Sequence, residues 1–381
     1  MPTFQILEKV NPNDWNNDLK KSKFTNFFQT YEYLDTQSNI GKRFPLFISI
    51  FDEKGETKGQ LGLLIQESVT AHSSLQMNRF LNLFSNLAKR GSWVSGPIIH
   101  EEDNDTRFEI LKSLVLALNE VAKKYNLALI DGYSPPLDTR INSRYLELFK
   151  NESYQIENFF TFITDLHQPL DVIWNKIHNS TKRDVQRAQK RGIIVKELDD
   201  YNELENYFLL TRQFGKTKGM VSENFSEKYK EKFWQCIKSG IEKIFLSYED
   251  GELVAGHRLG CFNHIVYSNK VTNSYVKPTS LGGPILTWHA LNWAKQAGMR
   301  VYDFSGGESP PTDESKMERY RQKWESLLSY KRKWGGTELS YYHFVKTFSK
   351  KKYKFFRIIY KPDYALREYK RKHYRRTNLH Y

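Results

Sequence analysis

The order of predicted elements most constrains the fold, because a hairpin, a strand, a helix and a strand occur in this order twice. In the first half, β-rich runs flank a turn at 52–59, and apolar residues at helical spacing cover 106–126. Strands are expected at 127–136 and 159–166. The first half therefore predicts mixed helices and strands around a sheet.

The second half repeats the pattern. A hairpin is expected at 244–262 with its turn at Asp250-Gly251, and a strand at 264–271 continues the sheet. A helix over 283–298 ends at Gly298, and a strand follows at 300–307. The doubled order predicts an α+β fold of two similar domains and a terminal extension: residues 1–165, 166–345 and 346–381.

The composition predicts a globular cytoplasmic protein. Hydrophobic residues make up 39% of the 381 residues, enough for packed cores, yet no run reaches the roughly 18 apolar residues of a membrane helix. The N-terminal stretch has no signal-peptide pattern. The two cysteines, Cys236 and Cys261, cannot form a disulfide framework or a structural zinc site, so no metal is expected.

The net charge of +14 is concentrated at the C-terminus. Residues 346–381 contain thirteen Lys or Arg against two acidic residues, so they carry +11 and leave +3 for the rest. Aromatic and Ile residues recur among these cations. The extension therefore predicts an anionic partner, either a membrane surface, RNA or an acidic patch of the protein itself; a solvated helix without a partner is the alternative. A membrane partner would place the protein at the inner face of the membrane.

One basic helix is expected after residue 178. Asn179 or Ser180 can cap it, and Gly192 ends it. Lys182 and Arg183 would then lie in the first turn, where the helix dipole disfavours cations by roughly 0.3–1 kcal/mol each. Such cations fit a phosphate or carboxylate site at the helix start, and a basic surface helix is the alternative.

Two further stretches contain candidate site residues. Gly282 and Gly283 precede a helix, where bare backbone can approach a pyrophosphate or a substrate carbonyl. Asp303 lies in an aromatic strand, "YDFSGG", and would be partly buried. It could orient a backbone turn, or it could move a proton or bind a substrate amine, with Ser305 opening the strand end into a cleft.

The stretch "LSYKRKWGG" (328–336) is expected to be the end of a strand. It places Lys331 between Tyr330 and Trp334. A solvated edge strand would explain the cations. Alternatively, a lysine held among aromatic rings in a low-dielectric cleft can stabilise an oxyanion or a leaving alkoxide.

These stretches, in this order, resemble the FemABX family of aminoacyl-tRNA-dependent peptidyltransferases, which build the interpeptide bridge of bacterial peptidoglycan. The resemblance covers most of residues 20–340 and is best in "TNFFQTYEY", "GSWVSGPII", "WNKIHNSTKRDVQRAQKRGI", "YDFSGG" and "LSYKRKWGG". It implies two tandem acetyltransferase-like (GNAT) domains, with the site in the second.

The resemblance also implies roles for the candidate residues. Lys331 would serve the transfer step with Tyr330 beside it, and Asp303 would hold or deprotonate the amine. Substrate-binding roles would fall to Lys182, Arg183, His257, Gly282, Gly283, Ser305 and Trp334. The donor would be an aminoacyl-tRNA or an acyl-CoA, with no permanently bound cofactor, and the acceptor an amine of a cell-envelope precursor. The protein would be a monomer.

Two alternatives remain open. The fold also includes acyl-CoA-dependent N-acyltransferases that act on acceptors outside peptidoglycan. A non-catalytic GNAT-like module that binds nucleic acid or membrane through the basic extension is the other alternative.

Overall fold

The computed structural model describes residues 2–40, 42–67, 89–217, 225–274, 281–310, 317–320 and 324–354. The predicted basic extension therefore lies outside the described residues from 355 onward. The chain divides into two compact units. Unit 1 takes its described residues from Met1–Glu157, Val221–Phe233 and Tyr341–Tyr381, and unit 2 from Asn158–Met220 and Trp234–Ser340.

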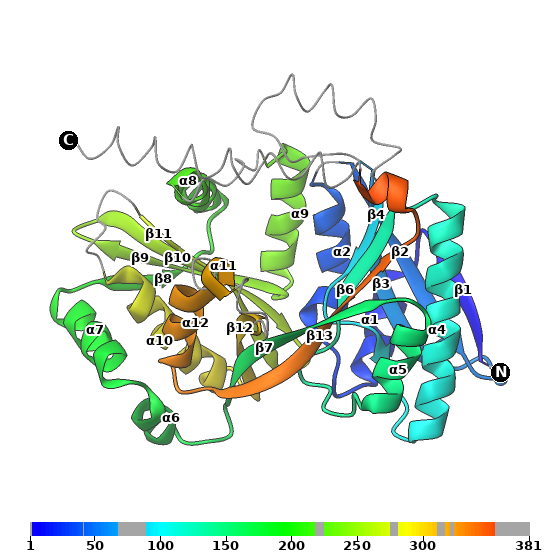
Figure 1. Ribbon diagram of the computed structural model, residues 1–381. Helices are drawn as coiled ribbons and strands as arrows, with labels where there is room; N and C mark the ends of the chain where they lie inside the picture. Colours follow the sequence, from blue (N-terminus) through cyan, green and yellow to red (C-terminus); the bar gives the residue numbers. More distant parts are fainter. Residues whose placement is uncertain are drawn as a thin grey trace. The chain divides into compact units, whose positions relative to one another are not determined.

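Unit 1 is a sheet with helices on both faces (Figure 1). Its strands pair in the order β1-β2-β3-β4-β6, with β5 against β3. The long helix α4 packs on one face, and α2 packs on the other. The elements are β1 (Thr3–Leu7), α1 (Pro12–Lys20), the 3-10 helix η1 (Phe27–Gln29), α2 (Tyr31–Ser38), β2 (Arg43–Phe51), β3 (Thr57–Gln66), β4 (Arg90–Trp93), β5 (Ile98–Ile99), α4 (Asn104–Lys124), β6 (Leu129–Tyr133) and α5 (Ser143–Asn151).

In unit 2 the strands pair in the order β7-β12-β11-β10-β9-β8. Helix α10 packs on one face and α8 on the other (Figure 1). The remaining elements are β7 (Gln155–Asp165), α6 (Leu170–Lys176), α7 (Asn179–Lys190), β8 (Ile194–Glu197), α8 (Tyr201–Thr217), α9 (Glu227–Lys238), β9 (Glu242–Glu249), β10 (Glu252–Phe262), β11 (Ile265–Asn273), α10 (Gly282–Gln296), β12 (Val301–Glu308), α11 (Met317–Tyr320), α12 (Ser326–Arg332) and β13 (Thr337–Thr347).

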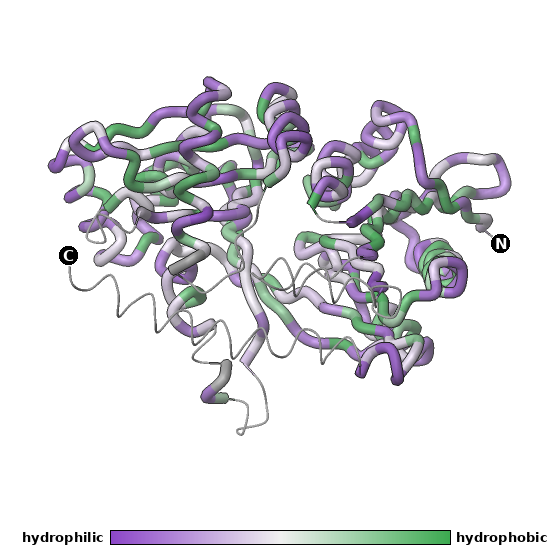
Figure 2. The backbone as a smooth tube through the Cα atoms, turned by 90° about the horizontal axis from the view of Figure 1, so that it is seen from above, coloured by the Kyte–Doolittle hydropathy of each residue, from purple (hydrophilic) through white to green (hydrophobic). Residues whose placement is uncertain are grey.

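Each unit has its own hydrophobic core. In unit 1, one face of α4, which includes Leu114, packs on the inner residues of β2 and β3, which include Leu63; both leucines are fully buried. In unit 2, Leu286 and Ala290 of α10 pack on the sheet beside Tyr302. Hydrophobic and hydrophilic stretches are interleaved along the chain in both units (Figure 2). This alternation is expected where helices and strands each bury one side.

The α+β class and both predicted hairpins are confirmed. The hairpin of β9 and β10 turns at Asp250 and Gly251, whose φ angles of 54° and 81° are those of a tight two-residue turn. The unit boundary is less simple than two continuous stretches. The C-terminal half of β13 pairs antiparallel with β6, with His343 opposite Tyr133, so this late segment contributes to unit 1.

Candidate active site

The candidate site forms around Asp303, which β12 places in the interior of unit 2 with 2% of its surface exposed. Its carboxylate accepts hydrogen bonds from Thr161 Oγ1 on β7 and from the backbone N–H of Ser305 at 2.7 Å. Burial raises the pKa of Asp303 to about 6, although Thr161, Ser305 and Lys331 each lower it. Asp303 thus titrates close to neutral pH.

An irregularity in β12 presents this carboxylate. The pairing of β12 with β7 shifts register between Asp303 and Gly306, and Ser305 between them has φ of 58°. A left-handed conformation costs a non-glycine residue roughly 1–2 kcal/mol. The Ser305 hydroxyl offsets part of this cost by donating to the Ser268 carbonyl at 2.9 Å. Backbone strain that the surroundings hold in place is typical of functional sites.

Hydrogen bonds connect this carboxylate to His257 across three neighbouring strands. His257 on β10 is fully buried, and its Nε2 lies 2.9 Å from Ser268 Oγ on β11. The backbone carbonyl of Ser268 in turn accepts a hydrogen bond from the hydroxyl of Ser305 on β12. Burial lowers the pKa of His257 to about 3; the charge of Lys331 acts in the same direction, and the backbone of Leu286 opposes the shift. The imidazole is therefore neutral at physiological pH and suits orientation of its neighbours better than proton transfer.

Lys331 and Tyr330 lie on the short helix α12, so the prediction of a strand end at this stretch is wrong. Leu328, Lys331 and Trp334 follow one another at intervals of three residues, which is a helical spacing. A stretch of nine residues is too short for this spacing to be recognised. The Gly-Gly marks the exit from the helix: Gly335 has φ of 74° and donates to the Arg332 carbonyl. Strand β13 begins only after it.

The environment of Lys331 matches that of a functional cation. Burial lowers the pKa of its ammonium group to about 8, and the charge of Asp303 opposes this shift. Lys331 also acts electrostatically on His257, so it lies near both ends of the hydrogen-bonded series. A cation with reduced hydration interacts strongly with negative charge that develops beside it.

Tyr330 projects toward α10. Its hydroxyl lies 3.5 Å from Thr287 Oγ1, and burial raises its pKa, with the charge of Asp184 on α7 acting in the same direction. Its ring packs edge-on against Trp334 at 6.2 Å. Tyr330 therefore remains a neutral phenol that positions the end of α12.

Trp334 is part of the core, with 1% of its surface exposed and its ring stacked on Phe304 at 6.0 Å. The following glycines are required by packing. A Cβ at Gly335 would lie 2.4 Å from the Lys176 carbonyl oxygen, and one at Gly336 would lie 2.9 Å from that of Ile163. The whole turn thus anchors α12, and with it Lys331.

The glycines at the start of α10 also lie against the protein's own strands. A Cβ at Gly282 would lie 2.6 Å from Ser247 Oγ, and one at Gly283 would lie 2.8 Å from Asn273 Oδ1. The small residues let the helix start pack closely on the sheet. Contact of this turn with a substrate stays a prediction.

Helix α7 starts one or two residues earlier than predicted. Its N-cap is His178, whose Nδ1 accepts from the Ser180 N–H at 3.2 Å, and not Asn179 or Ser180. Lys182 and Arg183 are consequently the fourth and fifth helical residues, beyond the most unfavourable part of the dipole. The His178 N–H donates to the Lys333 carbonyl at 2.8 Å, which joins the start of α7 to the end of α12.

Replacing both Lys182 and Arg183 with Gln tests their predicted contact with an anionic substrate. Arg183 is exposed, and the Lys182 Nζ donates to the Asn175 carbonyl at 3.1 Å, so we expect little change in melting temperature. Substrate affinity should fall by up to about 1.5–3 kcal/mol per lost contact, and less in high salt. A lower melting temperature with unchanged affinity would assign both cations to the fold.

Three site residues are not predicted from the sequence: Thr161, Ser268 and Thr287. Each is a single hydroxyl residue without a motif around it, and Thr161 precedes its partner Asp303 by 142 positions. Only the pairing of β7 with β12 brings these two side chains together. Strand alternation alone can predict that Thr161 and Ile163 point to opposite faces from Phe160 and Phe162, but not which strand lies next to them.

The described residues contain no group of three or more His, Cys, Asp or Glu side chains that could hold a metal ion. Within the same ranges, none of the helices combines the length and hydropathy needed to cross a membrane.

The fold is that of tandem GNAT proteins. Residues 175–322 match the family described as an acetyltransferase (GNAT) domain, a range that contains Asp303, His257 and the start of α10. No curated protein matches the sequence.

The solved structures that share the fold include the following three. A crystal structure of FemX is 15% identical, with TM-score 0.67, and the match covers 92% of this chain and 99% of FemX. L-PGS from Bacillus licheniformis is 13% identical, with TM-score 0.54 and coverage of 93% and 97%. A tandem GNAT protein from the clavulanic acid biosynthesis pathway is 8% identical, with TM-score 0.52 and coverage of 90% and 98%. The predicted resemblance to a FemX-like fold is thus confirmed at the level of structure.

Proposed function

We propose that this protein is an acyltransferase that moves an aminoacyl or acyl group onto an amine of a cell-envelope precursor. The observation that carries the proposal is a desolvated lysine, Lys331, within electrostatic range of a buried carboxylate, Asp303. A base and a cation in one low-dielectric site are the two groups that attack of an amine on an activated carbonyl requires. The FemX-like fold supports the reaction class.

In the proposed reaction, the acceptor nitrogen attacks the carbonyl carbon of an aminoacyl ester or a thioester. Lys331 stabilises the negative charge that forms on the carbonyl oxygen. The carboxylate of Asp303 orients the amine and takes the proton that it loses when the new C–N bond forms. The C–O or C–S bond to the carrier then breaks, and the leaving oxygen or sulfur takes a proton from Lys331 or from water. Holding the two substrates together supplies much of the rate enhancement.

The second candidate is a non-catalytic module that binds an anionic surface, which the basic C-terminal extension favours. Thermal melting of the full chain with acyl-CoAs, aminoacyl-tRNA, uncharged tRNA, UDP-linked muropeptide and anionic vesicles separates the candidates. Stabilisation by a donor that carries its acyl or aminoacyl group, beyond that by the carrier alone, supports the enzyme. The donor that stabilises the protein most then indicates the donor class. Equal responses to aminoacyl-tRNA and uncharged tRNA, with none to acyl-CoA, support the module.

The pH dependence of transfer follows from the two pKa values. Asp303, with a pKa near 6, must be ionised, so kcat/KM should fall below about pH 6. Lys331, with a pKa near 8, must be protonated, so kcat/KM should also fall above about pH 8. We therefore expect a bell-shaped profile, measured with the donor and acceptor identified by the melting panel.

The Lys331→Met variant supplies the reference for this profile, because titration of the acceptor amine is the same in both proteins. Its residual activity should lack the alkaline fall. Wild-type activity that keeps rising above pH 9 relative to this variant would show that Lys331 acts in its neutral form, which contradicts the proposed role.

A further inference from the structure

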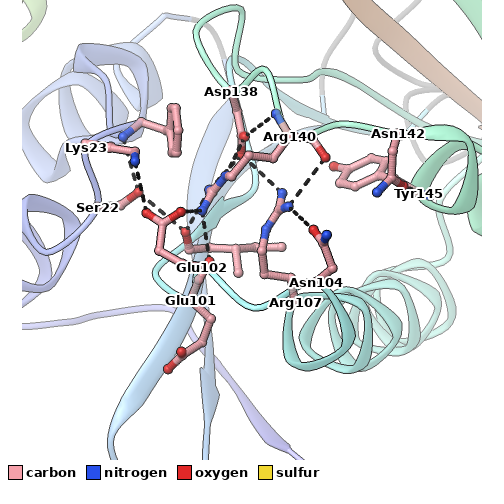
Figure 3. Close-up of polar contacts among 12 residues, drawn as sticks. Ser22, Lys23, Glu101, Glu102, Asn104, Arg107, Asp138, Arg140, Asn142 and Tyr145 are labelled. Atoms are coloured by element: carbon pink, nitrogen blue, oxygen red, sulfur yellow. Dashed lines mark hydrogen bonds and ion pairs between the residues drawn. The ribbon is translucent and has the colours of Figure 1, made fainter.

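A cavity of about 200 Å³ lies in unit 1, lined by residues at the N-terminal ends of α4 and α5. Ile99, Phe108 and Leu111 form its apolar wall, and Arg107, Arg140 and Tyr145 are among its polar residues. Figure 3 shows the two arginines on either side of Asp138. The N-terminal end of α5, capped by the neutral Asn142, adds positive potential that favours an anion, whereas Asp103 and Asp105 offset the potential of α4.

The buried groups of this cluster carry an excess positive charge. Arg107 and Arg140 share the carboxylate of Asp138, and the side chains of the three are only 6%, 15% and 6% exposed. Glu102 also contacts Arg140, at 3.2 Å, but it is 64% exposed and largely solvated. Two buried cations and one buried anion leave one positive charge without a buried partner. Such a charge is costly unless a ligand or another group compensates it.

Arg107 is the poorly satisfied member of the pair. Its guanidinium lies 3.3 Å from Asn104 Oδ1, 3.4 Å from the Arg140 carbonyl and 3.6 Å from Asp138 Oδ2. Arg140, by contrast, donates to Asp138 at 2.8 and 3.0 Å. Among the described residues, Arg107 Nε has no hydrogen-bond partner. Burial lowers the pKa of Arg107, while Asp138 opposes this shift, as expected for a cation with limited compensation.

Tyr145 adds a second unsatisfied donor. Its side chain is 8% exposed, and its buried hydroxyl finds no partner among the described residues. Burial and the charge of Asp138 raise the pKa of Tyr145, whereas the charge of Arg107 lowers it. The hydroxyl therefore lies close to the arginine cluster. Buried polar atoms without partners are costly, and a small rotation of either side chain toward the cavity would let a bound acceptor satisfy them.

We propose that this cavity is a binding site for a small organic monocarboxylate with a compact apolar body, such as an aromatic ring. One carboxylate matches the single excess charge, offers acceptors to a guanidinium and a phenol, and leaves its apolar part against Phe108 and Leu111. Inorganic phosphate would leave this wall uncovered, and the third cation that lines the cavity, Arg144, is half exposed and already paired with Asp105. The site lies wholly in unit 1, so its test is independent of the proposed transfer reaction.

Isothermal titration of the full chain with benzoate, benzamide and inorganic phosphate tests the proposal. Benzoate should bind saturably with one site per chain. Benzamide has nearly the same shape without the charge, and phosphate has charge without an apolar body, so each should bind at least about 10-fold more weakly. Equal binding of benzamide and benzoate, tighter binding of phosphate, or no saturable binding of benzoate would each overturn the proposal.

Two variants test the assignment of residues. Tyr145→Phe removes an unpartnered hydroxyl, so the melting temperature should be kept while benzoate affinity falls about 3- to 10-fold. Asn142→Asp keeps the N-cap that accepts from the Tyr145 N–H, but it adds a negative charge at the cavity and should weaken benzoate binding more than about 10-fold.

Asn11→Asp is the matched control, because Asn11 caps α1 in the same unit and is not among the residues that line the cavity. It should leave benzoate affinity unchanged. Unaltered benzoate affinity in both cavity variants, or an equal loss in the control, would show that binding occurs elsewhere and would refute the assignment.

Discussion

Replacing Lys331 with Met is expected to lower the transfer rate by about 10²- to 10³-fold, because it removes the cation that would stabilise the developing oxyanion. Met keeps most of the side-chain volume. The ammonium group it removes is desolvated and has its pKa lowered to about 8, so the fold should not lose stability. The measurement is kcat/KM at pH 7 with the donor and acceptor that the melting panel identifies, together with the melting temperature.

Lys333→Met is the matched control for this change. Lys333 lies two positions further along, its side chain is exposed, and its backbone carbonyl, which the substitution keeps, accepts from His178. Its transfer rate should stay within about twofold of the wild type, as for most surface substitutions. Near-normal transfer by Lys331→Met would exclude this lysine from the mechanism. Equal losses in both variants would assign the effect to the general charge of α12.

Local patterns in the sequence were sufficient for the long elements. The helix α10 has apolar residues at helical spacing and a glycine with φ of 71° after its end, so both its face and its stop can be predicted. The turn at Asp250-Gly251 has the residue types that a two-residue hairpin requires. In both cases the information lies within about fifteen neighbouring residues.

The errors arose where the deciding contact is distant or unusual. The helix α12 has only seven residues, and what fixes it is the packing of Leu328 and Trp334 into a core built from other segments. The N-cap of α7 is a histidine, a residue type that N-cap preferences do not favour over the neighbouring Asn179 and Ser180.

The candidate site could be predicted only in part for the same reason. Asp303 and Lys331 stand in recognisable stretches, but each shifts the pKa of the other from a different element, and Thr161 acts on Asp303 from a third. Thr161 reaches Asp303 through the pairing of β7 with β12, which no local pattern encodes. Burial, the largest cause of both pKa shifts, is likewise a property of the packed unit and not of the sequence around either residue.

Gly306→Ala is expected to be the most destabilising of the substitutions considered. Its Cβ would lie 1.5 Å from the Phe160 carbonyl oxygen and 2.6 Å from Thr161 Cα, so the clash is with backbone and cannot be relieved by a rotamer change. Hydrogen bonds hold β7 and β12 together on both sides of Gly306. On one side the Thr161 hydroxyl donates to Asp303, and on the other the Ser309 N–H donates to the Asn158 carbonyl at 3.0 Å. We expect a loss of at least about 3 kcal/mol, beyond the usual cost of overpacking.

Gly192→Ala separates this clash from the general cost of replacing a glycine. Gly192 has φ of 70° and no atom within 4 Å of an added Cβ, so its replacement should cost only about 1–2 kcal/mol of backbone strain. Thermal melting of both variants should show a drop of about 6–12 °C for Gly306→Ala and a clearly smaller one for Gly192→Ala. Because β7 would be pushed from β12 where Thr161 meets Asp303, the folded fraction of Gly306→Ala should lose the hydrogen bond that lowers the pKa of Asp303, and its acidic limb should move to higher pH. If Gly306→Ala melts at or above the melting temperature of Gly192→Ala, β7 and β12 must lie further apart at Gly306. The tight placement of the Asp303 carboxylate would then be wrong.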